Sequence, residues 1–300
     1  MLRSGCGVTL AARPATPRPV CADFRRYLSA DLDRVCCDAV SAADVRTAHA
    51  GGRVRRLDWD SRFFGVPSGR LEMLWRDDSV PAGRAWDRLV PALLHRAAEL
   101  GLVFLDVRIA AEELALAQAL EAGGFRLVDA LAVYLRDLGR QPSRVIVPAV
   151  SIDVAGFLRE ALADMHWGRL FADPRVARDK AEEFYFLSTL HYLESGAHTS
   201  VLVEAGAPVG LAIGIPDEEG SRLTGRRLGD LWLFIVSPRH KGKGFGKRLF
   251  NQFCAEFAAR VELVEIGTQI QHVAANRIYR SAGDFPVAHA LTFHRWAEPG

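Results

Sequence analysis

The chain has 300 residues, of which 49% are apolar and 25% are charged, and its formal net charge is +2 at pH 7. The length suits two ordinary domains, the composition is that of a globular protein, and the near-neutral charge excludes the basic footprint of a nucleic-acid-binding protein. No apolar run is long enough to span a bilayer, and the five cysteines, an odd number without metal or redox spacing, favour a reducing cytoplasm. We therefore expect a cytoplasmic protein with no metal, no nucleic-acid partner and no membrane partner.

The first 50 residues are weakly patterned and contain a cluster of prolines at Pro14, Pro17 and Pro19. We predict a poorly ordered extension over 1–50, with a short helix around 31–45. A first domain is predicted over 51–140. Its expected elements are a strand at 53–59, an aromatic pair and turn at 63–65, a helix at 85–100, a strand at 103–109, a helix at 111–121 and one or two strands at 127–135.

A polar linker, Gly139 to Ser143, separates this part from a second domain predicted over 141–300. The expected elements are a strand at 145–150, a helix at 153–165, a helix from Asp173-Pro174 to near Gly196, a hairpin of 200–204 and 208–215, and strands at 231–236 and 264–268.

An internal repeat relates the two parts. The stretch that begins at Leu102 and the one that begins at Glu262 both run strand, helix, glycine, phenylalanine, strand. Six residues before Phe125 lies Ala119, and six residues before Phe285 lies Tyr279, so the count places Ala119 opposite Tyr279. The first half also has no counterpart of the glycine-rich stretch described next. We interpret it as a degenerate copy that packs against the second half and shapes its acceptor side.

Residues 230–246, DLWLFIVSPRHKGKGFG, combine an apolar strand, a basic glycine-rich turn and the start of an amphipathic helix. A Walker A loop would need Ser or Thr where Arg248 follows Lys247, and a dinucleotide fingerprint would need a glycine at Lys247, so both are excluded. Free N–H groups at such a turn, together with a helix N-terminus, favour a phosphate or pyrophosphate ligand. A flexible basic loop without a ligand is the alternative.

The pattern R-x-x-G-x-G, filled by Arg239, Gly242 and Gly244, resembles the coenzyme A pyrophosphate loop of the GNAT-type N-acetyltransferase superfamily. The resemblance implies an α/β (α+β) fold: a mixed, mostly antiparallel sheet flanked by helices, with a GNAT fold in the C-terminal half and a degenerate GNAT-like N-terminal half. It implies acetyl-CoA as co-substrate, and a strand that splays away from its neighbour before the loop. The coenzyme-binding residues that it implies are Ile235, Val236, Arg239, His240, Lys241, Gly242, Lys243, Gly244, Phe245, Gly246 and His272.

Acetyl transfer from a thioester to an amine needs a neutral amine, a polarised carbonyl and a proton for the departing thiolate. Tyr279 resembles the phenol that stands near the thioester sulfur in GNAT enzymes, in the pattern N-x-x-A-x-x-x-Y. Ala275 matches this pattern, whereas His272 replaces the asparagine. Tyr279 is the expected general acid, with a core tyrosine at a helix end as the alternative. Asp230, His272 or an ordered water could be the base, and Asp230 can equally be a surface residue at the end of a strand.

Three stretches, beginning near Leu57, at His166 and at Gly267, resemble a narrower family, the TDP-fucosamine acetyltransferases. That resemblance implies transfer of acetyl to the 4-amino group of a dTDP-linked amino-dideoxy sugar, with Arg169 and Arg178 as candidates for its diphosphate. Two alternatives remain: another acceptor (a polyamine, an aminoglycoside, an amino acid or a protein N-terminus), or a non-catalytic acyl-CoA-binding module. A homodimer is left open.

Overall fold

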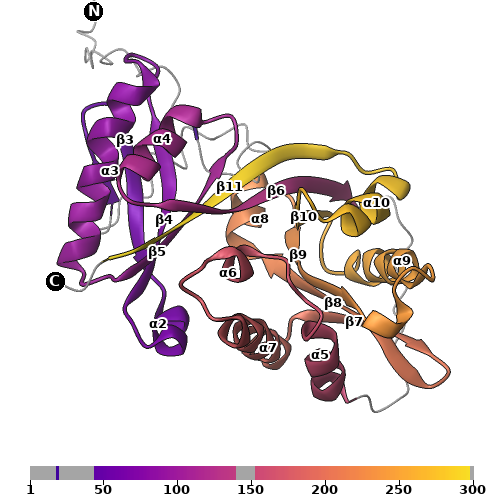
Figure 1. The fold of residues 1–300 in the computed structure, drawn as a ribbon. Helices are drawn as coiled ribbons and strands as arrows, with labels where there is room; N and C mark the ends of the chain where they lie inside the picture. Colours follow the sequence, from indigo (N-terminus) through magenta and orange to yellow (C-terminus); the bar gives the residue numbers. More distant parts are fainter. Residues whose placement is uncertain (1–17, 20–43, 140–152, 298–300) are drawn as a thin grey trace, which may run out of the picture.

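The computed structural model describes residues 18–19, 44–139 and 153–297, so the expected strand at 145–150 and nearly all of the expected helix at 31–45 lie outside the described residues. The described strands form one sheet in the order β2-β3-β4-β5-β11-β6-β10-β9-β8-β7, and β1 pairs with β4 (Figure 1). The strands are β1 (Arg18–Pro19), β2 (Asp44–Arg46), β3 (Ala50–Arg56), β4 (Ser68–Arg76), β5 (Phe104–Ala110), β6 (Arg126–Asp137), β7 (His198–Glu204), β8 (Ala207–Asp217), β9 (Leu228–Val236), β10 (Leu263–Gln269) and β11 (Pro286–Trp296).

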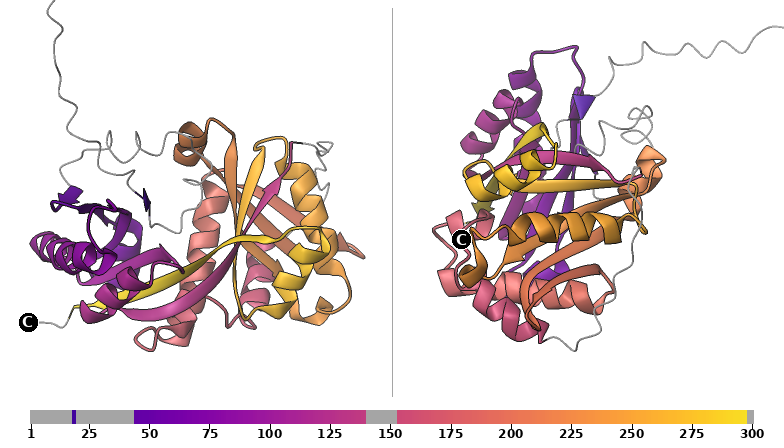
Figure 2. Two further views of the ribbon diagram at one scale, coloured as in Figure 1. Left: turned by 90° about the horizontal axis from the view of Figure 1, so that it is seen from above. Right: turned by 90° about the vertical axis from the view of Figure 1, so that its right-hand side faces the viewer.

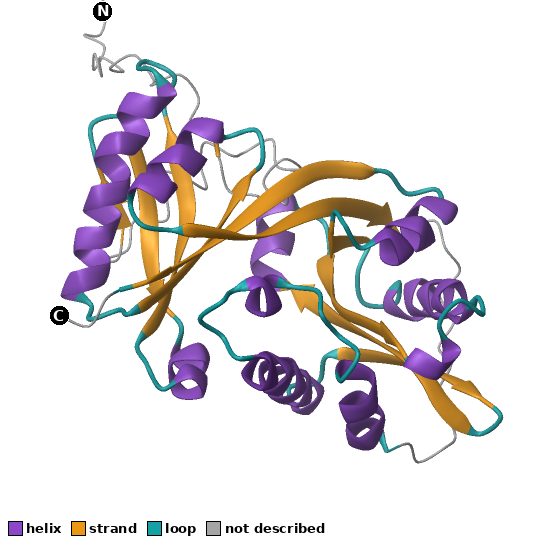
Figure 3. Ribbon diagram, viewed as in Figure 1, coloured by secondary structure: helices purple, strands orange, loops and turns teal. Residues whose placement is uncertain are grey.

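Helices cover both faces of this sheet, which is mixed and mostly antiparallel, as expected (Figure 3). They are α2 (Asp58–Phe64), α3 (Ala82–Glu99), α4 (Leu114–Ala122), α5 (Val154–Leu162), α6 (Arg169–Ala172), α7 (Arg178–Glu194), α8 (Glu218–Thr224), α9 (Phe245–Phe257) and α10 (Val273–Ser281), with a short 3₁₀ turn, η2, at Pro238–His240. The α/β fold class predicted from the sequence is confirmed.

The two halves exchange their last strands. Strand β6 of the first half pairs with β10 of the second, and β11 of the second half pairs with β5 of the first, while β6 and β11 pair with each other. Figure 2 shows these two strands running from one half into the other, and Figure 1 places the C-terminus beside the first half. Each half therefore completes the sheet of the other, which ties the two together.

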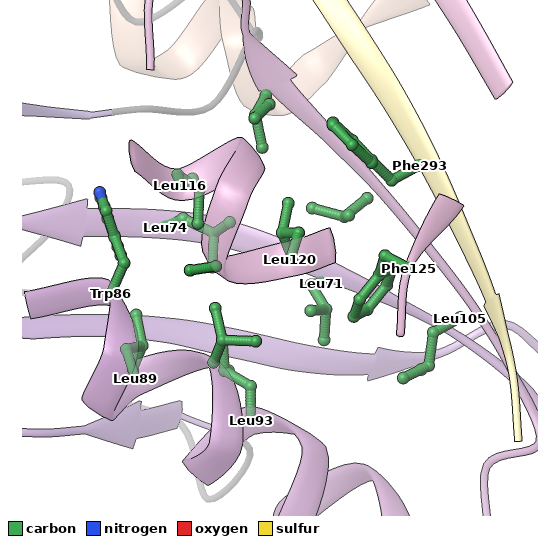
Figure 4. Close-up of a cluster of buried hydrophobic side chains, with 14 of the residues drawn as sticks. Leu71, Leu74, Trp86, Leu89, Leu93, Leu105, Leu116, Leu120, Phe125 and Phe293 are labelled. Atoms are coloured by element: carbon green, nitrogen blue, oxygen red, sulfur yellow. The ribbon is translucent and has the colours of Figure 1, made fainter. Parts of the chain in front are cut away.

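Apolar side chains of the exchanged strands also pack into the core of the other half. Phe293 of β11 belongs to the first core, the same cluster of buried side chains as Leu120 of α4 and Trp86 of α3 (Figure 4). In return, Tyr134 of β6 lies in the second core, beside Phe250 of α9. The side chains of these aromatic residues are at most 1% exposed. Removing a buried ring of this size costs about 3–5 kcal/mol, so each core depends on a residue from the other half.

The internal repeat is confirmed and extends further than the sequence indicated. Strands β4 and β9 have nine residues each and start at Ser68 and Leu228, 160 positions apart. The helices before them, α2 and α8, both end at a glycine in the left-handed region, Gly65 at φ 70° and Gly225 at φ 67°. From β5 and β10 onward the separation is 159, because the whole segment between β4 and β5 has one residue more than the segment between β9 and β10.

This one-residue difference corrects the expected pairing of Ala119 with Tyr279. Gly124 and Gly283, both with positive φ, end the last helix of each repeat and are 159 positions apart. Tyr279 therefore corresponds to Leu120, which is fully buried. The two phenylalanines used for the count are not equivalent, since Phe125 is 2% exposed and Phe285 is 73% exposed.

Candidate active site

The sheet opens between β9 and β10. These strands run parallel and pair only from Leu228 to Asp230, opposite Leu263 to Glu265. Beyond this point β9 pairs with β8 as far as Val236, and β10 pairs with β6 as far as Gln269. Backbone groups on one side of β9 thus face a gap in the sheet. At the end of the strand they are those of Val236, because Ile235 and Ser237 face β8. This is the splayed strand that the resemblance implied.

The glycine-rich turn lies directly after this open edge. Gly242 and Gly244 have φ of 74° and 83°, a region that residues with a Cβ rarely adopt. Gly246 serves packing instead, because a Cβ there would lie 2.6 Å from Cδ1 of Ile278 on α10. No backbone carbonyl of the described residues accepts a hydrogen bond from the N–H groups of residues 242–247. The start of α9 therefore presents several unused donors to an anion.

Two basic side chains of the turn form ion pairs with helix α5 and the residues just after it, which the sequence did not indicate. Arg239 Nε lies 3.2 Å from Glu160 Oε1, and Lys241 forms an ion pair with Asp164. The ring of His240 meets Phe245 edge-on, 5.4 Å between centroids. Both ion pairs are exposed, so each contributes little to stability. Lys243 is exposed and has no ion pair with a described residue.

Tyr279 projects from α10 into the second core and is 3% exposed. Its ring contacts Phe250 and Tyr134 at centroid distances of 5.1 and 5.3 Å, and Phe234 of β9 at 6.3 Å. Burial, followed by the nearby Cys254, raises its pKa well above the usual value. Its hydroxyl has no hydrogen-bond partner among the described residues, whereas Tyr134 Oη donates to Asn276 Oδ1 at 2.7 Å. Of these two adjacent phenols, only Tyr279 has a hydroxyl that donates no hydrogen bond to a described residue.

His272 precedes the first residue of α10 and stacks on Trp167, 5.2 Å between ring centroids and 21° between planes. Burial, then the positive charges of Lys241 and His166, lower its pKa. The segment between α5 and α6 thereby contacts the same helix end that lies beside the glycine turn. Nothing in the sequence pattern indicated Trp167 as a neighbour of His272.

Asp230 and Glu265 are register partners at the last paired position of β9 and β10. Their sequence neighbours Leu231, Val264 and Ile266 belong to the core under α9, so the two carboxylates lie on the opposite face of the sheet. Tyr279 lies on the α9 face. A group held in the gap would have the phenol on one side and the carboxylates on the other. Glu265 was missed in the sequence because its partner strand could not be known.

The corresponding positions of the first half are filled by its own side chains. Helix α3 begins at Ala82, earlier than the counterpart of Phe245, so the stretch that would be the turn is helix. Trp86, fully buried, occupies the position of Gly246. The Asp77 carboxylate accepts the N–H of Ser79 at 2.9 Å, at positions that correspond to Ser237 and Arg239. With Leu120 in place of Tyr279, this half has neither the anion site nor the phenol.

Arg169 and Arg178, the candidates for an acceptor diphosphate, lie apart. Arg169 contacts Asp106 Oδ2 at 3.3 Å and Asp60 Oδ1 at 3.9 Å, and its Nη1 lies 3.2 Å from Nε2 of His294. Arg178 donates to the carbonyls of Ala163 and Met165 at 3.1 Å. Arg169 thus already balances buried carboxylates, and Arg178 closes the end of α5.

His294 gives a pH prediction. Arg169 can only donate to Nε2, so the imidazole must be neutral with its Nδ1–H donated to Asp173 Oδ2 at 2.7 Å. Burial lowers the pKa of His294, and Arg169 adds to this, against the opposing effects of Asp173 and Asp106. Between the lowered folded pKa and about 6.5 the unfolded chain binds more protons, so the free energy of unfolding falls as pH drops below about 6.5.

Urea titrations between pH 8 and 5 measure this slope. The variant His294→Gln keeps a polar side chain without the titration and is expected to be less stable at pH 8 but to show a shallower decline. Burial lowers the pKa of His198 to about 4, so this residue also contributes to the pH dependence. Its contribution is the same in wild type and in His294→Gln and cancels when the two slopes are compared. An unchanged slope in His294→Gln would contradict the assignment.

Within the described residues, no helix is long and apolar enough to cross a membrane, and no group of three or more side chains could hold a metal ion.

Residues 160–284 match the model of the acetyltransferase (GNAT) family. No curated protein matches the chain. Among solved structures, a GCN5-related N-acetyltransferase from Sphaerobacter thermophilus superposes with a TM-score of 0.52 at 17% identity, over 84% of this chain and 78% of its own. One from Kribbella flavida gives 0.52 at 14% identity, over 93% and 96%.

A functionally unknown conserved protein from Staphylococcus epidermidis gives a TM-score of 0.52 at 13% identity, over 85% of this chain and 93% of its own. At such identities the structural likeness concerns the fold alone. The fold of this chain is that of the GNAT proteins, and the family match covers the splayed strand, the glycine turn and Tyr279. The likeness to the GNAT acetyltransferase family is therefore one of fold and of residues 160–284, which make up less than half of the chain.

Proposed function

We propose that the protein transfers the acetyl group of acetyl-CoA to a primary amine held at the gap between β9 and β10. The observation that carries this proposal is the series of unused N–H donors of residues 242–247 at the end of the splayed strand. Pyrophosphate oxygens match these donors, and the positive φ of Gly242 and Gly244 lets the backbone approach them.

The acceptor amine, once neutral, attacks the thioester carbonyl carbon. The C–N bond forms, the C–S bond breaks, and the Tyr279 hydroxyl gives its proton to the departing sulfur. The backbone N–H of Val236, on the open edge of β9, polarises the carbonyl. The carboxylate of Asp230, with Glu265 beside it, takes the proton that the amine loses. Acid and base then act from opposite faces of the sheet, so neither blocks the other.

For the acceptor we propose a nucleotide-linked amino sugar, such as a dTDP-4-amino-4,6-dideoxy sugar. The support is the likeness of three sequence stretches, one of which contains Phe63 and Phe64. These rings pack on Phe184 of α7 at centroid distances of 5.2 and 5.8 Å, so two of the stretches meet at the junction of the halves. The cytoplasmic location stays a prediction from the cysteine pattern.

The test offers acetyl-CoA with a panel of amines and follows release of the CoA thiol. The panel holds dTDP-amino sugars, spermidine, an aminoglycoside and free amino acids. Turnover at least tenfold higher on an amino sugar than on the other amines is expected. Efficient acetylation of spermidine or an amino acid, with none of the sugars, would overturn the acceptor and leave the chemistry in place.

A second candidate is an acyl-CoA-binding module without catalysis, in which Tyr279 serves only as a core residue, since its ring is 3% exposed and packs on Phe250. Calorimetry separates the two. Binding of acetyl-CoA with no thiol release for any amine supports the module, and release with an acceptor supports the transferase.

A further inference from the structure

A row of polar and charged side chains crosses the middle of the sheet on the face opposite to α9. From strand to strand the row consists of Arg70 on β4, Asp106 and Arg108 on β5, Thr292 on β11, Asp129 on β6, Gln269 and Glu265 on β10, and Asp230 on β9. A sheet face at the centre of a protein is normally apolar, and charges there are paired or bind a ligand. We call these residues the central polar row.

Two arginines at this row, Arg70 and Arg169, form ion pairs with carboxylates. Arg70 holds Asp106 through two bonds, Nε to Oδ1 at 2.7 Å and Nη2 to Oδ2 at 2.8 Å. Arg169 of α6 contacts the same Asp106 at 3.3 Å. Burial alone would raise the pKa of Asp106, but these two guanidinium groups hold it well below the usual range. Both oxygens of the Asp106 carboxylate are therefore paired with guanidinium groups.

Arg108 is the exception. Its contact is a single bond from Nε to Thr292 Oγ1 at 3.3 Å, and no carboxylate of a described residue lies within ion-pair distance of it. Its neighbours Val107 and Ile109 face the first core, so its side chain shares a face with Asp106. The side chain is also exposed, although it lies on an interior strand. The two terminal nitrogens of its guanidinium thus remain available to a ligand.

The charges around Arg108 favour an anion. Although solvent reaches the Arg108 side chain, the surrounding protein atoms lower its pKa by desolvation. The repulsion of Arg70 and Arg169 lowers it further, against the opposing effects of Glu265 and Asp106. An anion bound to Nη1 and Nη2 would relieve this repulsion and form the bidentate geometry that arginine gives to phosphate and carboxylate groups. The equivalent position in the second half is Gly267, so the feature belongs to the first half alone.

We infer that Arg108 binds an anionic group of the acceptor, a phosphate or a carboxylate, while its amine lies near Asp230 and Glu265. This inference rests on the proposed function for the amine, but the anion site itself does not. Arg108 comes from the first half and the glycine turn from the second. The degenerate half would therefore supply acceptor specificity, and the acceptors selected would carry both an amine and an anion.

Calorimetry on the full chain tests the site, with CoA at saturation so that the glycine turn is filled. The probes are dTDP and inorganic pyrophosphate, which carry phosphate groups, and succinate, which carries carboxylates. Comparing their affinities shows which of the two anions the site prefers. Wild type is expected to bind at least one of them, and Arg108→Gln to bind it at least tenfold more weakly. Arg108→Lys keeps the positive charge but cannot donate two parallel hydrogen bonds, so its affinity is expected to lie between those of wild type and Arg108→Gln. Arg88→Gln, an exposed arginine of α3, should match wild type.

Equal binding by wild type and Arg108→Gln would overturn the inference, and so would the absence of binding of every probe to wild type. Circular dichroism and melting temperature confirm that Arg108→Gln is folded, which its exposed position favours. If the anion binds through Arg108 but no amine is acetylated, the proposed function fails and the site stands. If amines are acetylated equally well by wild type and Arg108→Gln, the inference fails and the function stands.

Discussion

The variant Tyr279→Phe is expected to lower kcat for amine acetylation by about 10²-fold or more, the usual contribution of a positioned acid, while acetyl-CoA affinity stays within about twofold. The change removes one oxygen from a ring that keeps its contacts with Phe250, Tyr134 and Phe234. Because the hydroxyl has no partner among the described residues, its loss breaks no structural bond there. Pre-steady-state thiol release and calorimetry measure the two quantities separately.

Tyr134→Phe is the matched control, since it removes the neighbouring phenol of the same core. That hydroxyl is committed to Asn276, whose Nδ2 donates to the carbonyls of Gln269 and His272 at 2.9 Å. We expect a loss of about 1 kcal/mol in the free energy of unfolding and a change in kcat of only a few fold. Wild-type turnover in Tyr279→Phe, or equal losses in both variants, would remove Tyr279 from the acid role.

Gly244→Val is expected to weaken acetyl-CoA binding by more than tenfold. Gly244 precedes α9 with φ of 83°, and a β-branched residue in this region costs of order 1–3 kcal/mol. Apart from its chain neighbours, no described residue has an atom within 4 Å of the Cβ position, so the side chain would project into the open space in which we place the pyrophosphate. Strain and obstruction therefore act together at the anion site. Calorimetry with acetyl-CoA measures the effect.

Gly225→Val separates these two causes. Gly225 has φ of 67° and equally open space around its Cβ position, but it ends α8, away from the glycine turn. We expect a similar loss of thermal stability and unchanged acetyl-CoA affinity. If both variants lose affinity alike, the effect of Gly244→Val is general destabilisation and the turn is not the binding site.

Local patterns predicted the elements around the site well. The turn at Ala205 and Gly206, both with positive φ, joins β7 and β8 as a two-residue hairpin loop. Asp153 caps α5 by accepting the N–H of Gly156 at 2.8 Å. The order strand, glycine turn, helix between β9 and α9 is as expected. In each case the determining interactions lie within a few residues along the chain, so the sequence contains the information.

Two local expectations were wrong because tertiary contacts decide them. Pro174 was expected to start the long helix, but α7 begins at Arg178. Asp173 accepts the N–H of Arg175 at 2.9 Å and also binds His294 and Trp296 of β11, which holds 173–176 in a turn against the sheet. The expected strand at 53–59 ends at Arg56, since Asp58 begins α2.

The exchange of β6 and β11 could not be predicted from the sequence. Periodicity identifies a strand and its buried face, but its neighbours depend on long-range packing. The places of Tyr134 beside Tyr279, of Glu265 beside Asp230 and of Arg108 on the shared face all follow from that exchange or from strand register. For the same reason the expected role of the first half, shaping the acceptor side, could be stated from the repeat but not assigned to any residue.

Titration of acetyl-CoA into the full chain tests most directly whether each chain has one coenzyme site, formed by the glycine turn of the second half. The first half has Trp86 in the place of Gly246, and α3 already begins at Ala82, across the counterpart of the turn, so this half should contribute no site. We predict one equivalent bound per chain, with binding abolished or severely weakened in Gly244→Val. Two equivalents per chain, or one equivalent that Gly244→Val leaves unchanged, would contradict this assignment.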